Sequence, residues 1–446
     1  MSSFDWLVRE LEELKAGGLA REANDGGVRL EVIGCGEVEG RQFVDASSND
    51  YLGYAAFGVG GRGGWCQGLS GSRDILSGGA EPVGGDRSAH TEAYDVSRET
   101  LTTLSNRAGG RNVASTANLP NEFPASPGAG ASRLLGGTRP EHLALEGALA
   151  EWVGQDSALL FSSGYAANLG LLSSLAQRGD TVFSDALNHA SIIDGCRLSA
   201  AEILVYPHLD LDILATILRQ HRTSGRRFIV SESYFSMDAD SPKLTELRAL
   251  ADNFDATLIV DEAHALGIFG PKGAGLAQQQ GVLPDITVGT LGKAIGLQGA
   301  FVAGPSVLRS WLWNRARSFV YSTATTPRLA HQTLLHVKHI QENESARERL
   351  THLTDRVRAS VVAHGYTVTP RSHGPIIPIL IGNVQRAIDA AAALRTKGVL
   401  AYAIRPPTVA KDSARLRLTI NATMSDAAVA HLIDSLVRSL PPNHRT

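Results

Sequence analysis

Short apolar runs alternate with stretches of helical periodicity along most of the chain from Ser132 onward. Helices are predicted at 140–153 and 165–177, and long helical segments around 326–358. The apolar runs are unbroken rather than alternating, which is typical of strands buried on both faces. They are 158–161, 181–183, 227–231, 257–261, 286–290 and 299–304. Strands separated by helices predict a mostly parallel sheet covered on both faces, and hence an α/β fold.

The two ends of the chain carry weaker patterns. A smaller C-terminal unit is predicted, with strands at 374–381, 400–404 and 414–420 and helices at 384–397 and 425–439. Near the start, apolar spacing predicts a helix over 4–22, and short strands are predicted at 29–33 and 42–46. We therefore expect four segments: an N-terminal helix and strands, an atypical insertion, a large domain, and a connecting helix with a smaller α+β domain. Their bounds are 1–55, 56–126, 127–325 and 326–446.

The second segment departs from this order. Between Gly58 and Gly85, 11 of 28 residues are glycine, and large apolar residues are few as far as Pro127. Such a composition buries too little apolar surface to offset its ordering entropy, so we predict loop or disorder, with one short helix at 91–107. Three accounts are open: a disordered surface insertion, a segment that binds a partner, and a stretch scrambled by faulty gene translation.

Composition excludes several classes of protein. Among 446 residues, 42 basic and 45 acidic side chains give a net charge of −3, so no basic surface for nucleic acid or anionic lipid is expected. The three cysteines are widely spaced, which suits a reducing compartment. No basic leader opens the chain and no stretch reaches about 18 apolar residues, so the sequence predicts a cytoplasmic protein outside the membrane.

Polar side chains follow several of the predicted strands, where open α/β sheets bind their ligands. Asp261 ends one strand, and a buried carboxylate there needs a cationic partner such as a protonated pyridine nitrogen. His264 follows three residues later and can hydrogen-bond a ring hydroxyl. A structural Asp–His turn is the alternative. A metal site is disfavoured because further ligands at metal spacing are lacking.

A lysine lies just past the next strand. Lysine is scarce, at seven of the 42 basic residues, and Lys293 stands between Gly292 and Gly296. Burial lowers the pKa of such an amine and the glycines admit a cofactor, so Lys293 is a candidate for a Schiff base. A surface loop lysine is the alternative, and Asp261 upstream favours the Schiff base. His189 can stack on an aromatic cofactor, and the turn at 161–168 offers N–H groups for a phosphate, although both can be structural.

In combination these residues resemble the α-oxoamine synthases, a fold-type I family that depends on pyridoxal 5′-phosphate. The resemblance covers nearly the whole chain except about 56–126. The motifs that carry it are 47–53, 128–133, 188–191, 232–238, 261–264, 290–293 and 321–324.

The resemblance implies roles for individual residues. Lys293 would bind the cofactor covalently, Asp261 would pair with its ring nitrogen and His189 would stack on the ring; these three are the expected catalytic residues. The expected cofactor contacts further include Gly164, Tyr165, Ser236, His264, Thr290, Ser322 and Thr323. Ser322 and Thr323 would reach the phosphate of a neighbouring subunit, which implies a homodimer with shared sites. Substrates would meet Arg21, Asn49, His189, Thr408 and Arg417.

The stretches 184–195, 403–409 and 414–417 favour one reaction of this family. In it a pimeloyl thioester, carried by CoA or by acyl carrier protein, acylates L-alanine with loss of CO2. The alternatives within the family are glycine C-acetyltransferase, 5-aminolevulinate synthase and serine palmitoyltransferase. Outside these activities, a catalytically silent homologue is disfavoured because Lys293 is present. A dinucleotide binder is disfavoured because Gly128 follows no clear strand.

Overall fold

The computed structural model describes residues 36–38, 41–52, 54 and 126–440. The helix predicted at 4–22, the strand at 29–33, the helix at 91–107 and nearly all of the segment 56–126 lie outside these residues, as does Arg21. Their predictions are therefore untested.

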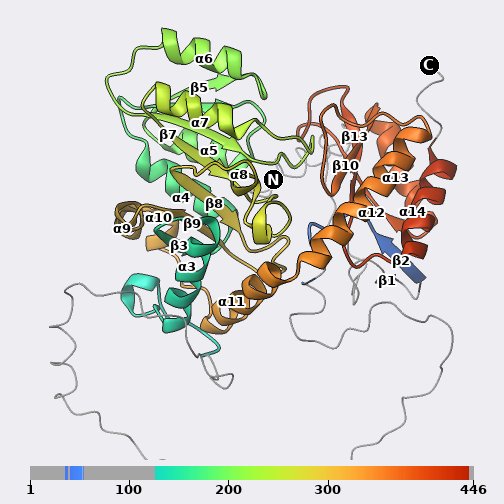
Figure 1. Ribbon diagram of the computed structural model, residues 1–446, viewed down its shortest axis with the longest axis horizontal. Coiled ribbons are helices and arrows are strands. Elements are labelled where there is room, and N and C mark those ends of the chain that lie inside the picture. The colour runs from blue at the N-terminus through green and yellow to red at the C-terminus, as the bar shows by residue number, and fades with distance from the viewer. Residues whose placement is uncertain (1–35, 39–40, 53, 55–125, 441–446) are drawn as a thin grey trace, which may run out of the picture. The chain divides into compact units, whose positions relative to one another are not determined.

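A seven-stranded sheet forms the centre of the part of the chain that the structure describes (Figure 1). Its strands are β3 (Ser157–Phe161), β4 (Thr181–Asp185), β5 (Glu202–Tyr206), β6 (Arg227–Glu232), β7 (Ala256–Asp261), β8 (Ile286–Thr290) and β9 (Ala300–Gly304). They lie in the order β3-β9-β8-β7-β6-β4-β5. Only β9 runs antiparallel to its neighbours, β3 and β8, so the sheet is mostly parallel as predicted.

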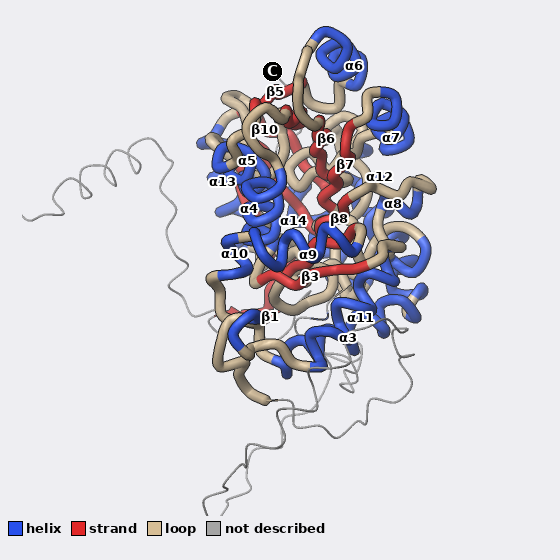
Figure 2. The backbone as a smooth tube through the Cα atoms, turned by 90° about the vertical axis from the view of Figure 1, so that its left-hand side faces the viewer, coloured by secondary structure: helices blue, strands red, loops and turns tan. Residues whose placement is uncertain are grey.

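Helices cover both faces of this sheet because alternate strand residues point to opposite sides. In β3, Leu159 and Phe161 pack into one buried cluster and Ala158 and Leu160 into another. The first cluster lies under α4 (Gly164–Leu175), α5 (Ala190–Leu198), α9 (Ser306–Arg315) and α10 (Arg317–Val320). The second lies under α3 (Pro140–Val153), α6 (Leu211–Gln220), α7 (Leu244–Asn253) and α8 (Leu276–Gln279). Figure 2 shows the central strands between these two layers.

A smaller unit follows the large sheet. The helices α11 (Pro327–Glu342) and α12 (Glu344–Ala363) lead to an antiparallel sheet of β10 (Ile376–Gly382), β13 (Ala414–Thr419) and β12 (Tyr402–Ile404). A second small sheet joins β1 (Gly36–Val38), β2 (Arg41–Asp45) and β11 (Val399–Leu400). The helices α13 (Val384–Thr396) and α14 (Asp426–Ser439) complete the unit. Short 3-10 turns occur at Arg133–Leu135 and Pro271–Gly273.

Most predicted boundaries are confirmed within a few residues, and one strand is corrected. The strand expected at 400–404 is two strands, because β11 pairs with β2 whereas β12 pairs with β13. Strand β5 had no prediction of its own. It lies at the sheet edge, where only Tyr206 of its five residues is buried, although 203–206 is a short apolar run like the others.

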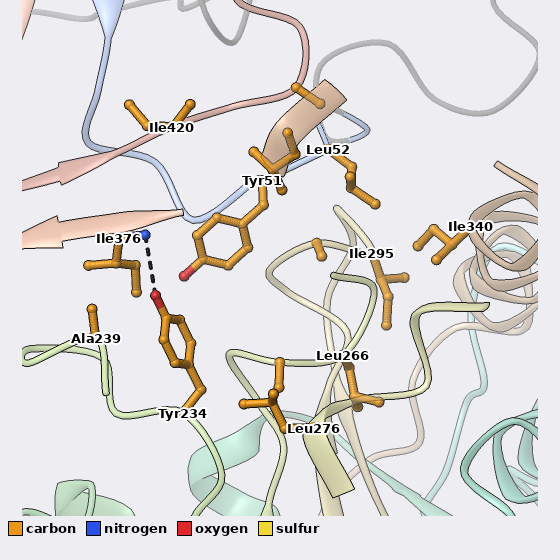
Figure 3. Close-up of a cluster of buried hydrophobic side chains, with 14 of the residues drawn as sticks. Tyr51, Leu52, Tyr234, Ala239, Leu266, Leu276, Ile295, Ile340, Ile376 and Ile420 are labelled. Carbon is orange, nitrogen blue, oxygen red and sulfur yellow. Dashed lines mark hydrogen bonds between the residues drawn. The ribbon is translucent and has the colours of Figure 1, made fainter. Parts of the chain in front are cut away.

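The N-terminal segment, the large sheet and the C-terminal unit share one buried cluster (Figure 3). Tyr51 and Tyr234 lie side by side in it, and the backbone N–H of Ile376 donates to the Tyr234 hydroxyl at 3.4 Å. This packing fixes residues 44–52 against the end of the large sheet. No helix among the described residues has both the length and the apolar character needed to span a membrane.

Candidate active site

Three neighbouring parallel strands end in polar residues at one edge of the large sheet. They are Glu232 on β6, Asp261 on β7 and Thr290 on β8. Glu232 pairs with Asp261 in the β6–β7 register, so the two carboxyl groups belong to adjacent strand ends. Ligands of open α/β sheets bind at this edge.

Asp261 is a buried carboxylate with neutral hydrogen-bond donors. Its Oδ2 accepts from Asn168 Nδ2 at 2.8 Å and its Oδ1 accepts from the backbone N–H of Ala263 at 2.9 Å. Its exposed fraction is 6%. Neutral donors leave a full negative charge in a poorly solvated place, so this carboxylate favours a nearby cation.

Lys293 supplies one such cation, in the loop that follows β8. Burial lowers the pKa of its amine to about 8, with a further lowering by Arg417, although Asp261 and Glu232 oppose both effects. An amine with this pKa is still mainly a cation at pH 7, but about one molecule in ten is unprotonated, a far larger share than for a solvated lysine, so it is more nucleophilic. Burial raises the pKa of Glu232 to about 8, with a further raising by Asp261, although Lys293 opposes both effects.

The start of α4 lies beside the end of β8. A Cβ placed on Gly164 would stand 3.7 Å from Thr290 Oγ1, so the helix N-terminus and the threonine hydroxyl adjoin. The Ser163 side chain caps the helix by accepting from Ala166 N at 3.1 Å. The N-terminal end of a 12-residue helix beside a hydroxyl suits a phosphate group. Tyr165, by contrast, donates its hydroxyl proton to Asp194 on α5.

His189 caps α5, and the residue is partly exposed and partly buried. Its Nδ1 lies 2.8 Å from Ser191 Oγ, which accepts from Asn168 Nδ2 at 3.0 Å. Because Asn168 also holds Asp261, one chain of hydrogen bonds orients both predicted residues. Partial burial and the charge of Lys293 lower the pKa of His189 against the opposing effect of Asp261, so its ring is neutral at neutral pH.

Four further predicted residues lie on the side of the candidate site that faces the C-terminal unit. They are Asn49, Ser236, His264 and Arg417. Arg417, on β13, donates from Nε to the backbone oxygen of Ser236 and from Nη2 to Asn49 Oδ1, both at 2.8 Å. His264 is buried, and its pKa lies well below its usual value because of burial and the charges of Lys293, Arg417 and His189. Its Nδ1 lies 2.9 Å from the hydroxyl of Tyr51.

Other predicted residues lie elsewhere. Ser322 donates to the backbone oxygen of Ser318 at 2.6 Å, and Thr323 forms an isolated bridge with Ser132. Both line a small cavity with Arg133, away from the contacts of Lys293 and Asp261 described above. Thr408 is exposed in the loop that follows β12, where its backbone N–H donates to the carbonyl of Arg405 at 3.1 Å.

The structure adds three residues to which the sequence gave no role. They are Asn168, Tyr51 and Glu232, all buried at the site. Tyr51 and Glu232 lie in motifs that carry the family resemblance, and Asn168 lies in the turn that offers N–H groups to a phosphate. Membership in these stretches was the only sign in the sequence that the three residues belong to the site. Their partners are distant in sequence, so only the fold shows what they contact.

The donor set fits pyridoxal phosphate. The Lys293 amine matches its aldehyde, and the buried Asp261 carboxylate matches its ring nitrogen. The flat imidazole of His189 matches the ring face, and the α4 N-terminus with the Thr290 hydroxyl matches the phosphate. Among the described residues, no cluster of three or more histidine, cysteine or acidic side chains could hold a metal ion.

Comparison with known proteins agrees with this assignment. The family model for aminotransferase class I and II matches residues 112–436, and the chain belongs to this family. Its relatives lie in the α-oxoamine synthase branch. The 8-amino-7-oxononanoate synthase of Anaeromyxobacter dehalogenans (strain 2CP-1) is 40% identical over 98% of this chain and 96% of its own length. That of Alkalilimnicola ehrlichii is 47% identical over 69% of this chain and 79% of its own.

Solved structures show the same fold. Serine palmitoyltransferase of Sphingomonas wittichii matches with a TM-score of 0.76 at 25% identity, over 98% of this chain and 97% of its own. The 8-amino-7-oxononanoate synthase of Francisella tularensis matches with a TM-score of 0.60 at 28% identity, over 68% and 87% respectively. The predicted family, fold class and cofactor are thereby confirmed.

Proposed function

We propose that this protein condenses L-alanine with a pimeloyl thioester to give 8-amino-7-oxononanoate, a step of biotin biosynthesis. The new bond joins the alanine Cα to the thioester carbonyl carbon, the thiol leaves, and the alanine carboxyl group departs as CO2. The observation that carries the proposal is the grouping of Asp261 and Lys293 at one edge of the large sheet with Arg417 of β13, whose charges both act on Lys293. The names of the relatives at 40% and 47% identity support the choice of substrates.

Pyridoxal phosphate, when bound, supplies an electron sink for the electrons released at the amino-acid Cα. Lys293 would hold it covalently, and Thr290 with the α4 N-terminus would bind its phosphate. Asp261 would keep its ring nitrogen protonated, and His189 would stack on the ring. Ser236 and His264 would hydrogen-bond its hydroxyl. Gly164 would allow close approach of the backbone, with Tyr165 nearby.

The remaining chemistry belongs to side chains of this chain. Arg417 would bind the alanine carboxylate through its guanidinium fork, with Asn49 alongside. The Lys293 amine would remove the Cα proton, and its lowered pKa lets it accept and return that proton near neutral pH. His189 would orient the alanine from its exposed face, while Arg21 and Thr408 would contact the acyl donor.

The assembly is part of the proposal. We expect a homodimer in which Ser322 and Thr323 of one subunit complete the phosphate site of the other. Large apolar side chains near Thr323 support this, because Leu135 is 82% exposed and Tyr321 is 74% exposed. CoA or acyl carrier protein would deliver the pimeloyl group. The cytoplasmic location is proposed from the scattered cysteines, and the four-segment division of the chain is likewise a proposal.

A second activity has one observation in its favour, which is the fold match to serine palmitoyltransferase. The two activities differ in the amino acid and in the acyl chain. Product formation should therefore be compared with alanine, glycine and serine, each offered pimeloyl-CoA, palmitoyl-CoA and acetyl-CoA. We expect turnover of alanine with pimeloyl-CoA to exceed the other pairs, and a preference for serine with palmitoyl-CoA would replace the proposal.

The role of Lys293 is tested by Lys293→Ala. We expect no cofactor to be retained after borohydride reduction and denaturation, and no turnover of alanine, because the amine that binds the cofactor and moves the Cα proton is gone. The measurement is intact mass together with product formation. As a control, Lys272→Ala removes a lysine on a surface turn and should leave both results unchanged. Covalent cofactor and turnover in Lys293→Ala would refute the assignment.

A further inference from the structure

Tyr51 connects two groups of the candidate site. Its side chain is completely buried in the cluster of Figure 3. Its hydroxyl oxygen lies 2.9 Å from His264 Nδ1 and 3.2 Å from Asn49 Oδ1, which in turn accepts from Arg417 Nη2 at 2.8 Å. The residue therefore stands between the arginine expected to bind the substrate carboxylate and the histidine expected at the cofactor hydroxyl.

The directions of these hydrogen bonds follow from the inventory of donors. A phenol has one O–H group, so Tyr51 can donate only one hydrogen bond although two acceptors lie within reach. The single Tyr51 proton is then donated to one of two acceptors. Asn49 Oδ1 already accepts from Arg417 Nη2 at 2.8 Å, whereas His264 Nδ1 is the nearer and more basic acceptor. Tyr51 therefore donates to His264 Nδ1.

The protonation states agree with this direction. Burial raises the pKa of Tyr51 to about 12 against the lowering influence of Arg417, so the hydroxyl keeps its proton at neutral pH. The lowered pKa of His264 leaves that imidazole neutral with a single proton. A neutral imidazole whose Nδ1 accepts a hydrogen bond must carry its proton on Nε2.

We propose that Tyr51 is a positioning residue, which fixes His264 as the tautomer protonated on Nε2 and couples it to Arg417 through Asn49. The inference rests on the proposed function, because the ring hydroxyl of pyridoxal phosphate is the acceptor that an Nε2–H would serve. It also gives a consequence for binding. A substrate carboxylate that accepts hydrogen bonds from Arg417 weakens the donation from Arg417 to Asn49 Oδ1. Asn49 Oδ1 then competes more strongly for the Tyr51 proton, so amino-acid binding changes the hydrogen bond at His264 Nδ1.

The tautomer can be observed directly in holoenzyme whose histidines carry ¹⁵N. The His264 signals are identified by their loss in His264→Gln. We expect the wild type to show protonated Nε2 and unprotonated Nδ1. Tyr51→Phe should show a mixture of tautomers, because Nδ1 has lost its donor. Tyr54→Phe is the matched control, since Tyr54 is also buried but its hydroxyl accepts from Asn343 Nδ2 at 3.0 Å.

Binding gives a second readout. Loss of one buried hydrogen bond should weaken the affinities for pyridoxal phosphate and for alanine, followed by visible absorbance, by about three- to tenfold in Tyr51→Phe. Tyr54→Phe should stay within about twofold of the wild type, because its hydrogen bond lies outside the site. The NMR spectrum separates these effects from a loss of packing, which would not move a proton between ring nitrogens.

Two results would overturn the inference. One is a wild-type His264 protonated on Nδ1, which decides the matter even if Tyr51→Phe does not fold. The other is a Tyr51→Phe variant that keeps the wild-type tautomer and affinities. Failure of the proposed function has a different signature, because wild-type protein would then bind cofactor without forming product from alanine and a pimeloyl thioester.

Discussion

Individual residues at the site divide into those that mark a strand end and those whose partners are distant in sequence. Asp261 could be predicted because an apolar strand runs into it, and Lys293 because a lysine between glycines follows the next strand. Asn168 could not be assigned, because its hydrogen bond to Asp261 spans 93 residues. Tyr51 reaches His264 across 213 residues, which no local pattern encodes. Sequence thus predicts the chemical groups better than the side chains that orient them.

The fork geometry of Arg417 leads to a prediction. Its guanidinium is already held by Ser236 and Asn49 through two separate nitrogens, which fixes the plane offered to a carboxylate. Arg417→Lys keeps the charge but loses the bidentate contact. We expect the KM for alanine to rise about ten- to hundredfold, with a smaller change in kcat, as measured by steady-state kinetics.

Arg415 provides the matched control two residues away on the same strand. It donates to Asp238 at 2.7 Å and to the backbone oxygen of Met237 at 2.9 Å, which a lysine can partly replace. Arg415→Lys should therefore leave the KM for alanine within about threefold of the wild type. Equal KM values for the two variants would contradict the role of Arg417.

At the scale of elements, an ionic contact joins the loops that carry the site. His208, which follows β5, lies with Nδ1 2.8 Å from Asp185 at the end of β4 and with Nε2 3.2 Å from Asp240 beyond β6. The loop after β4 continues to His189, and the loop after β6 contains Ser236. Burial alone would lower the pKa of His208, but hydrogen bonds and charges from both carboxylates outweigh it and raise the pKa to about 9.

This raised pKa predicts a pH-dependent contribution to stability. The group binds its proton more tightly when folded, so the stabilisation is complete below the unfolded pKa of about 6.5 and is lost as pH rises through about 9. Each pKa unit corresponds to about 1.4 kcal/mol, so the contribution is at most about 3.5 kcal/mol. We expect the Tm difference between wild type and His208→Asn to be largest near pH 6 and to shrink above pH 9.

Asp240→Asn removes one of the two carboxylates that raise the pKa of His208. The Tm difference between wild type and this variant should therefore depend on pH in the same direction but less strongly. Thermal denaturation of the three proteins across this pH range makes the comparison, since all other titrations are common to them. A Tm difference that stays constant with pH would show that His208 contributes packing rather than charge.

Elements themselves were predictable where their own pattern decided them. Strand β8 matches its predicted bounds because five consecutive buried residues follow one another. Helix α3 matches because Pro140 starts it and Gly154 ends it in a left-handed conformation. The break between β11 and β12 was not predictable, because it depends on which sheet each half joins.

On the scale of the whole molecule, the proposal includes a second copy of the chain, which would complete the phosphate site. Thr323 pairs with Ser132, and the residues around this bridge expose large apolar side chains, including Leu135 and Tyr321. The guanidinium of Arg317 lies 4.9 Å from the Tyr321 ring centre, which gives this face a cation beside its aromatic group. Such a face suits burial against a partner subunit.

Subunit exchange tests the shared site. Thr323→Glu places a negative charge where the phosphate of the partner's cofactor is proposed to lie, and Lys293→Ala removes the covalent contact. Each homodimer should be inactive. After the two are mixed and allowed to exchange, about half of the dimers are heterodimers, each with one of its two sites made only of native residues, so about one quarter of wild-type activity should return.

The heterodimer must be isolated for the result to be decisive. With different affinity tags on the two variants, tandem purification gives a sample in which about half of the wild-type activity is expected, because one site in two is native. Each variant exchanged with a differently tagged copy of itself controls for recovery caused by refolding. A purified heterodimer without activity would mean that Thr323 serves the site of its own subunit. Activity in the Thr323→Glu homodimer would mean that Thr323 does not approach the phosphate at all.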